Sequence, residues 1–484
     1  MGFSCEGVAM RSPERCAALR FATALCAAVG TTALIGCTAF DAPQVRHDET
    51  LRHQTALAEK TVLLLGDERG LTLEDCVRIA LANNLDVQVA DVRRRIAQLD
   101  RRIAFSAFLP HVNLNYTYAR WDPQPEVVIA GGSMPMHDER IREITWQIQM
   151  SVFNPTTWFL YALHTHGEQV AELAADYTRQ MIVLQVTTLY YYCLGLEEVG
   201  RALDSQILAA ESLAEQVQAF HAEGLALGWQ VEQVHVALEF RRTQRKRVEQ
   251  ILDQTRGQLL LTMGLNPLAS IRLRTGPGEE PPTGSLEALV AEALLNHPQL
   301  RIADRQVAIE KEKVHIALAN FLPSLVGVAN RVNTSDSFQR YSSTWMLGLA
   351  GVMTVFNGFA NVYEYEAAKQ GVTRAALERE QQSLVIMLQV LRAQRNLDSA
   401  RDQLRLAEDQ LVMTEHRYEQ TRQEWHEGLV DTPTLLSVVA ERDQARMFHT
   451  TARFQFQVAA ATLRNAMGMT RTRIASSDDP EEKG

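Results

Sequence analysis

The chain has 484 residues, 46% of them hydrophobic, and a formal net charge of −10 with 22% charged residues. A mildly acidic chain offers no electrostatic attraction for nucleic acid, so a nucleic-acid-binding protein is not expected. The length exceeds that of a typical single domain and suffices for a large buried interior or a long assembly.

The N-terminal segment has the features of a lipoprotein signal. Three arginines precede an uncharged, mostly apolar run over residues 21–36, which is too short to span a bilayer and is typical of a signal peptide. The run ends in Leu-Ile-Gly-Cys, which resembles a bacterial lipobox. We expect residues 1–36 to be removed, Cys37 to carry lipid and residues 37–70 to form a linker. A plain signal peptide followed by an incidental cysteine is the alternative.

The rest of the chain contains one structural unit twice. Short motifs of the first half recur in the second half at spacings of 203 to 213 residues. They are Leu-Glu (from 73 and 286), Phe-Leu-Pro (108 and 321), Val-Phe-Asn (152 and 355), Glu-Gly-Leu (223 and 427) and Met-Gly (263 and 467). We therefore expect two repeats, residues 71–275 and 284–470, and a disordered polar tail at 471–484.

Each repeat is predicted to contain a helix, two strands, a long helix, a turn and a further helix. Residues 73–108 lack Pro and Gly and end before Pro110, as a helix does when a strand follows. As a helix, the run 156–222 would be roughly 100 Å long, and the runs 73–108 and 229–264 would each be roughly 54 Å long. Two short helices placed end to end therefore match one long helix.

The long helices show the coiled-coil period. Large apolar residues recur every seven positions in the second repeat, with alanines between them that permit close helix approach. These residues are Leu397, Leu404, Leu411 and Tyr418, with Ala400 and Ala407. An ordinary helical bundle remains possible on this pattern alone.

The strand segments alternate between apolar and polar residues. Alternation over about nine residues, with aromatics among them, is typical of strands in an outer-membrane β-barrel, although a half-buried soluble hairpin is the alternative. In the second repeat the alternation is poor over residues 325–333. The residues expected on the outward face are Val112, Leu114, Tyr116, Tyr118, Ile144, Trp146, Ile148, Met150, Val152, Trp345, Leu347, Leu349, Met353 and Val355.

Four strands cannot close a barrel, and an open sheet edge is not tolerated in lipid. The chain must therefore oligomerise, and these physical arguments allow two, three or four copies.

The duplicated set of motifs resembles the TolC family of outer membrane factors over about residues 71–470. The resemblance implies an α+β membrane protein with an internal twofold repeat. Four β-strands per chain would contribute to a trimeric 12-stranded β-barrel, and the helices would form a long periplasmic α-helical barrel. It further implies a passive outer-membrane channel for tripartite efflux or type I secretion, lipid-anchored at Cys37. Its partners would be a periplasmic adaptor protein and an inner-membrane pump of the RND or ABC type.

The resemblance also assigns the two Glu-Gly-Leu turns to the periplasmic tips. Gly224 and Gly428 each lie between helical runs, where a turn needs a residue that can adopt positive φ. With Leu225 and Leu429 they are the predicted tip turns.

The pore constriction departs from the family pattern. Many members carry aspartates shortly after the second turn, where this chain has Thr434 and Ser437, and Gln230 stands where the first repeat often has Asp. Asp431 lies nearby and could replace the missing acids, although an exposed acid in a turn is usually only solvated. These four residues are the constriction candidates, and we expect only weak block by cations.

We expect no enzymatic activity, no cofactor and no metal site, because no catalytic cluster or nucleotide-binding motif is visible. His164 and His166 would point to different faces of a helix. Met134, Met136 and His137 are soft-metal ligand types in the longer hairpin loop, and such a cluster is more often incidental. The alternative function is a structural periplasmic coiled-coil lipoprotein, which does not explain the alternating strands.

Overall fold

The computed structural model describes residues 42–65, 70–129, 131–276, 278 and 280–470. The expected signal peptide, Cys37 and the C-terminal tail lie outside these residues. The chain divides into two compact units, residues 1–63 and 64–484. Helix α2 (Ala42–Leu65) occupies part of the expected linker and belongs mostly to the first unit. The other described helices and strands belong to the second unit.

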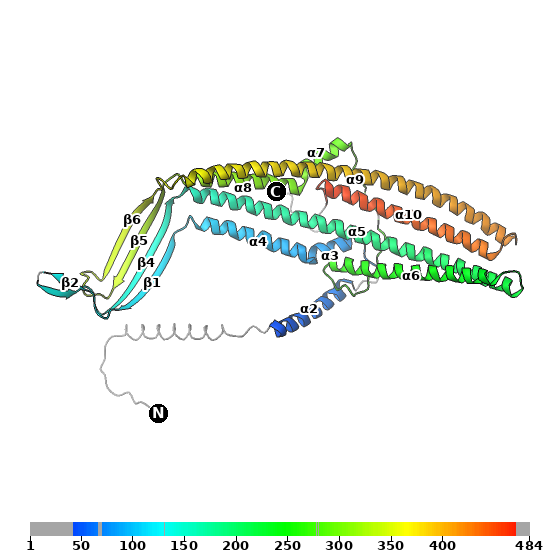
Figure 1. The fold of residues 1–484 in the computed structure, drawn as a ribbon, viewed down its shortest axis with the longest axis horizontal. Coiled ribbons are helices and arrows are strands. Elements are labelled where there is room, and N and C mark those ends of the chain that lie inside the picture. The colour runs from blue at the N-terminus through cyan, green and yellow to red at the C-terminus, as the bar shows by residue number, and fades with distance from the viewer. Residues whose placement is uncertain (1–41, 66–69, 130, 277, 279, 471–484) are drawn as a thin grey trace, which may run out of the picture. The chain divides into compact units, whose positions relative to one another are not determined.

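The element order within the second unit repeats once, as predicted (Figure 1). The first repeat contains α3 (Leu73–Asn83), α4 (Leu85–Ser106), β1 (His111–Arg120), β2 (Glu126–Ile129), β3 (Gly132–Pro135), β4 (Arg140–Phe153), α5 (Pro155–Ala222) and α6 (Gly228–Thr262). The second repeat contains α7 (Leu286–Asn296), α8 (Pro298–Ala319), β5 (Ser324–Thr334), β6 (Ser343–Val352), α9 (Ala360–His426) and α10 (Thr432–Ala466). Residues 132–135, which were expected to lie in a hairpin loop, instead form β3 and pair with β2.

The first helix of each repeat is broken, so the prediction of one continuous helix over 73–108 was wrong. Asn84 and its equivalent His297 have extended backbone conformations and cap the helix that follows. Asn84 Oδ1 accepts a hydrogen bond from the backbone N–H of Val87 at 3.1 Å. His297 Nδ1 accepts from the N–H of Gln299 at 3.2 Å, and burial lowers the pKa of His297, which keeps the ring neutral.

Helix α5 packs against the stacked pair α3–α4 on one side, against α6, and against α8 and α10 of the second repeat. Helix α9 packs likewise against α7, α8 and α10. With 68 and 67 residues, α5 and α9 are each about 100 Å long. The runs 73–108 and 229–264 together match the length of α5, as predicted, although the first run is divided into α3 and α4.

The predicted seam of small residues on α9 is also confirmed. Ala400 and Ala407 are buried, and the seven-residue spacing continues through buried Thr414 and Thr421. Small side chains at this period allow neighbouring helices to approach closely.

Each repeat has its own core beneath its shorter helices. Leu259 of α6 and Met263, which follows the end of α6, pack in the first core, and their equivalents Leu463 and Met467 pack in the second. All four are at most 1% exposed. The first core also buries Cys76 and Cys193 as free thiols, and desolvation raises the pKa of each to about 12, so both are unreactive.

The packing at the ends of α6 and α10 requires a glycine in each Met-Gly motif. Gly264 has a φ of +68°, and a Cβ placed on it would lie 2.3 Å from the carbonyl oxygen of Asn83. Gly468 has a φ of +70°, and a Cβ placed on it would lie 2.7 Å from the Cα of His297. The end of each final helix therefore docks where the first helix of the same repeat is broken, with no room for a side chain.

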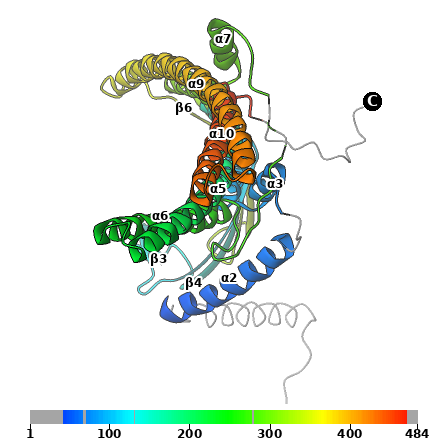
Figure 2. The same ribbon diagram turned by 90° about the vertical axis from the view of Figure 1, so that its right-hand side faces the viewer.

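The four long strands form one antiparallel sheet in the order β1-β4-β5-β6. Each repeat contributes one hairpin, and the β4–β5 pairing joins the repeats. In Figure 1 the sheet lies at one end of the second unit, and the α5–α6 and α9–α10 turns lie at the other. Seen from the end of the turns, α6, α5, α10 and α9 form a curved layer with α3 and α7 on its convex side (Figure 2). Among the described helices, none is long and apolar enough to cross a membrane.

Candidate functional site

The two tip turns have the same hydrogen-bonded geometry. Gly224 and Gly428 have φ values of +77° and +75°, which confirms the predicted positive φ. The N–H of Leu225 bonds the carbonyl of Phe220 at 2.8 Å, and Leu429 makes the equivalent bond in the second repeat. A Cβ on either glycine would meet no described atom within 4 Å. Glycine is therefore needed here for its conformation and not for space.

Apolar side chains project from these turns. Leu225 is 73% exposed and Leu429 is 69% exposed. Leu227 and Trp229, which the sequence analysis did not select, are also exposed. Trp229 directly follows Gly228, and an aromatic residue next to a glycine in this turn segment was the signal that the sequence offered. The first turn thus presents an apolar surface, which is typical of a protein-binding site.

The four constriction candidates lie at the N-terminal ends of α6 and α10. Gln230 Oε1 accepts a hydrogen bond from the N–H of Leu227 at 2.8 Å, which caps α6. Ser437 donates to the carbonyl of Thr434 at 2.9 Å, and both side chains are exposed. The structure thus brings Asp431, Thr434 and Ser437 together at the start of α10. Gln230 lies at the start of α6, in the helical hairpin of the first repeat.

Asp431 has a structural partner on each carboxylate oxygen. Its Oδ1 accepts from the backbone N–H of Thr434 at 3.1 Å and caps α10. Its Oδ2 accepts from Gln216 Nε2 of α5 at 2.7 Å. Hydrogen bonds from Thr434 and then Gln216 lower the pKa of Asp431, so the carboxylate is ionised at neutral pH. Helix capping therefore explains an acid at this position.

Polar contacts also connect α5 of the first repeat to α10 of the second repeat farther from the turns. Ser205 of α5 donates to Asp443 of α10, and Gln206 donates to Gln444 at 3.2 Å. Together with the Gln216–Asp431 bond, these contacts join the two repeats along the part of α5 that approaches the tip.

One face of the sheet is apolar across its width. Trp146 lies opposite Leu114 in β1 and Arg331 in β5, and Trp345 lies opposite Arg331 in β6. Trp345, Leu347 and Leu349 therefore share the face of Trp146, as predicted. The expectation for Met353 and Val355 was wrong because β6 ends at Val352.

The alternation of apolar and polar residues is poor in β5 because its residues on the apolar face are mostly small or polar. On the apolar face β5 contributes the small residues Gly327 and Ala329, which lie between bulky neighbours in β4 and β6. Arg331 and Asn333 are the polar exceptions on this face, and the guanidinium of Arg331 lies 5.4 Å from the centre of the Trp345 ring. Arg331 is close to the end of β5 that leads into the β5–β6 loop.

A second apolar surface runs along α4. Its residues follow the alternating three- and four-residue spacing of a coiled coil and are between 48% and 66% exposed. They are Leu85, Val89, Val92, Ile96, Leu99 and Ile103. The spacing is visible in the sequence, but only the structure shows that the stripe has no partner among the described residues.

The cluster considered for soft metals has another role. His137 Nδ1 lies 2.8 Å from Asp336 Oδ2, so the side chain connects the β3–β4 loop to the β5–β6 loop. Met134 and Met136 are exposed. Within the described residues, no group of three or more His, Cys, Asp or Glu side chains is arranged to hold a metal ion.

Comparison with known proteins agrees with this architecture. Residues 289–469 match the sequence model of the outer membrane efflux protein family. The fold resembles that of CusC, with a TM-score of 0.66 and 16% identity over 82% of this chain and 92% of that one. It also resembles the Campylobacter jejuni CmeC outer membrane channel, with a TM-score of 0.70 and 16% identity over 84% and 87%.

The open state of the Neisseria gonorrhoeae MtrE outer membrane channel is similar too, with a TM-score of 0.63 and 14% identity over 82% and 90%. No curated protein matches the sequence. The family match lies in the second repeat, and the similarity in fold extends across both repeats. The fold of the chain is that of the TolC-like channels. The alternative of a purely structural coiled-coil protein is not supported, because it accounts for neither the sheet nor these matches.

Proposed function

We propose that this protein is the outer-membrane channel of a tripartite efflux or type I secretion system and acts as a passive homotrimer. The observation that carries the proposal is the open sheet with one exposed apolar face. In the described chain, β1 and β6 each have a strand partner on one side only. Three chains would supply twelve strands, and closing them removes every edge.

The helical part supports the same assembly. The α4 stripe lies at one margin of the helical layer beside the sheet, and α9 lies at the other margin. On α9, Leu377, Leu384 and Leu388 are exposed. In a ring of three chains, the α4 stripe of one subunit would pack against α9 of the next and bury both surfaces.

The tips are the proposed docking surface for a periplasmic adaptor. Outer membrane efflux channels of this family are homotrimers that work with adaptor and inner-membrane pump partners. The exposed Leu225, Trp229 and Leu429 support such a contact here. Because the sequence contains no nucleotide-binding motif, an RND or ABC pump would supply the energy.

The proposed entrance is lined by Gln230, Asp431, Thr434 and Ser437 without a ring of free acids. Asp431 is ionised but is held by Thr434 and Gln216. We expect weak cation block of the channel for this reason.

Loss of the gene should sensitise cells to at least one toxic compound that the cognate pump exports. The purified protein should also form ion-conducting pores in a planar bilayer, with only weak block by trivalent cations added from the tip side. Absence of pores from correctly folded trimers would contradict the channel function. Strong saturable block would instead show that Asp431 forms an acidic ring.

The proposed anchor is a lipid on Cys37 in the outer membrane, with most of the chain in the periplasm. Palmitate labelling should disappear in Cys37→Ser, while export should be partly retained because the barrel itself crosses the membrane. Unchanged labelling of Cys37→Ser would show that Cys37 is not the lipidated residue.

A further inference from the structure

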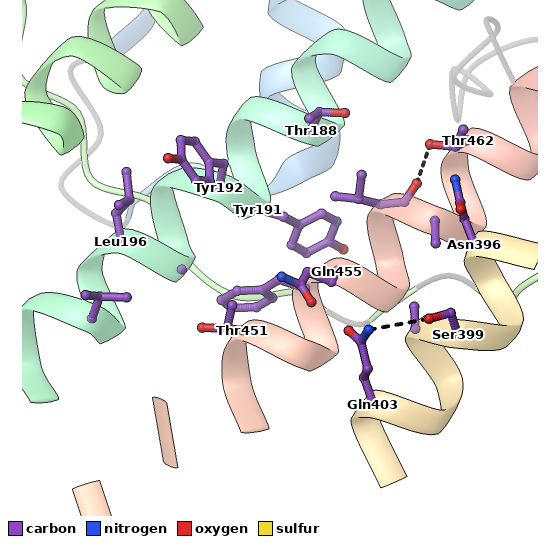
Figure 3. A pocket seen from close by; sticks show the side chains of 16 residues that line it. Thr188, Tyr191, Tyr192, Leu196, Asn396, Ser399, Gln403, Thr451, Gln455 and Thr462 are labelled. Atoms are coloured by element: carbon purple, nitrogen blue, oxygen red, sulfur yellow. Dashed lines mark hydrogen bonds between the residues drawn. The ribbon is translucent and has the colours of Figure 1, made fainter. Parts of the chain in front are cut away.

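A pocket of about 530 Å³ lies between α5, α9 and α10, close to the middle of the helical layer (Figure 3). This volume is within the range of small-molecule binding sites. The rings of Tyr191 and Phe454 lie in its wall with their centres 5.4 Å apart. Leu196, Val199 and Val458 add aliphatic surface, so much of the lining is apolar.

The pocket opens on the concave side of the helical layer. The segment that connects the repeats covers the opposite side of α10, where Arg464 bonds the carbonyl of Glu280 and a Cβ on Gly278 would touch Gln457. The pocket residues Thr451, Gln455 and Val458 lie on the other side of the helix, because successive residues turn by about 100°. In the trimer proposed above, the concave side would face the lumen.

The polar groups of the pocket define its chemistry. None of the sixteen lining side chains, all within the described residues, is charged. Asn396, Gln403 and Gln455 supply amide donors and acceptors. Thr451 Oγ1 is buried and has no hydrogen-bond partner among the described residues.

Gly195 keeps the pocket open. Glycine is the least favourable residue after proline in a helix interior, and Gly195 lies within α5. A Cβ at this position would meet Phe454 Cδ2 at 3.9 Å, which is ordinary van der Waals contact. Packing therefore does not require glycine here, and its effect is to leave space beside the aromatic wall.

We propose that this pocket is a binding site in the channel wall for uncharged, amphipathic aromatic solutes that carry hydrogen-bonding groups. The proposal rests on the channel function above and names a class of solute that the lumen would hold. The aromatic wall would stack on the solute ring, and Thr451 with the amides would bond its polar groups. Because the lining helices all belong to one chain, a trimer would carry three such sites.

The test uses radiolabelled chloramphenicol, an uncharged nitroaromatic compound with amide and hydroxyl groups, in equilibrium dialysis against the purified trimer. We expect saturable binding of one molecule per chain. Gly195→Met should weaken binding roughly tenfold or more by filling the pocket. Thr451→Val should weaken it by about threefold or more, because it removes the buried hydroxyl at nearly constant volume.

Gly167→Met is the matched control, since Gly167 lies in the same helix and a Cβ there meets no described atom within 4 Å. Its affinity should stay that of the wild type. The proposal is overturned if wild-type binding is not saturable, or if Gly195→Met and Thr451→Val both bind as Gly167→Met does.

Conductance of the same preparation separates this proposal from the channel function. Trimers that conduct but do not bind chloramphenicol saturably refute the pocket alone. Trimers that bind at the Gly195 site but form no pore refute the channel function and leave the pocket as a ligand site.

Discussion

Replacing Leu347 by Arg should strongly reduce the amount of assembled protein in the outer membrane. Leu347 lies in the middle of β6, is 79% exposed, and shares its face with Ala329 of the neighbouring strand. A charged side chain facing hydrocarbon near the bilayer midplane costs roughly 2–4 kcal/mol. A trimer would incur that cost three times. The measurement is the heat-sensitive trimer band on a denaturing gel of outer-membrane fractions.

Two adjacent residues of β4 provide the matched comparison. Ile148 lies on the apolar face, opposite Val112 and Ala329, whereas Gln147 lies on the other face, opposite Asn113 and Asn330. Ile148→Arg should reduce the trimer as Leu347→Arg does, and Gln147→Arg should be tolerated better. Equal amounts of trimer in Ile148→Arg and Gln147→Arg would show that the apolar face does not contact lipid.

Replacing Gly428 by Trp should abolish export and leave the trimer intact. The φ of +75° at Gly428 costs an ordinary L-residue roughly 1–2 kcal/mol, and an indole adds bulk to the proposed docking surface. The sheet and both cores lie away from this turn (Figure 1). The measurements are resistance of cells to an exported compound and the trimer band from the same cells.

Two milder substitutions separate strain from bulk. Gly428→Asn should keep most export, because Asn adopts the left-handed conformation more readily than other residues with a side chain. Gly428→Ala adds strain with little bulk and should give an intermediate result. Full resistance with Gly428→Trp at normal expression would mean that the adaptor docks elsewhere.

Local chemistry made much of this architecture predictable from the sequence. Alternation of residues such as Trp146 and Ile148 identified strands with one apolar face, since side chains in a strand point to opposite sides in turn. Gly224 and Gly428 marked turns between helices because glycine tolerates positive φ, and both have it. The alanine spacing at Ala400 and Ala407 identified a close helix seam that is buried in the structure.

Where the sequence analysis failed, long-range packing was responsible. The break at Asn84 lies in a run free of Pro and Gly, although Pro298 begins the equivalent helix α8, and it is where the end of α6 docks and Asn84 Nδ2 bonds the carbonyl of Thr262 at 2.8 Å. The capping of α10 by Asp431 could be read locally, but its bond to Gln216 joins residues 215 positions apart.

The sequence by itself determined the duplication, the lengths of the two long helices, the four long strands and the turns, because each depends on residues close together in the chain. Only the tertiary structure decided that α4 has an exposed apolar stripe, that β5 places Gly327 and Ala329 between bulky neighbours, and that Gly195 borders a pocket. These features depend on which distant segments pack together. A periodic pattern predicts an apolar face but does not say which partner, if any, covers it.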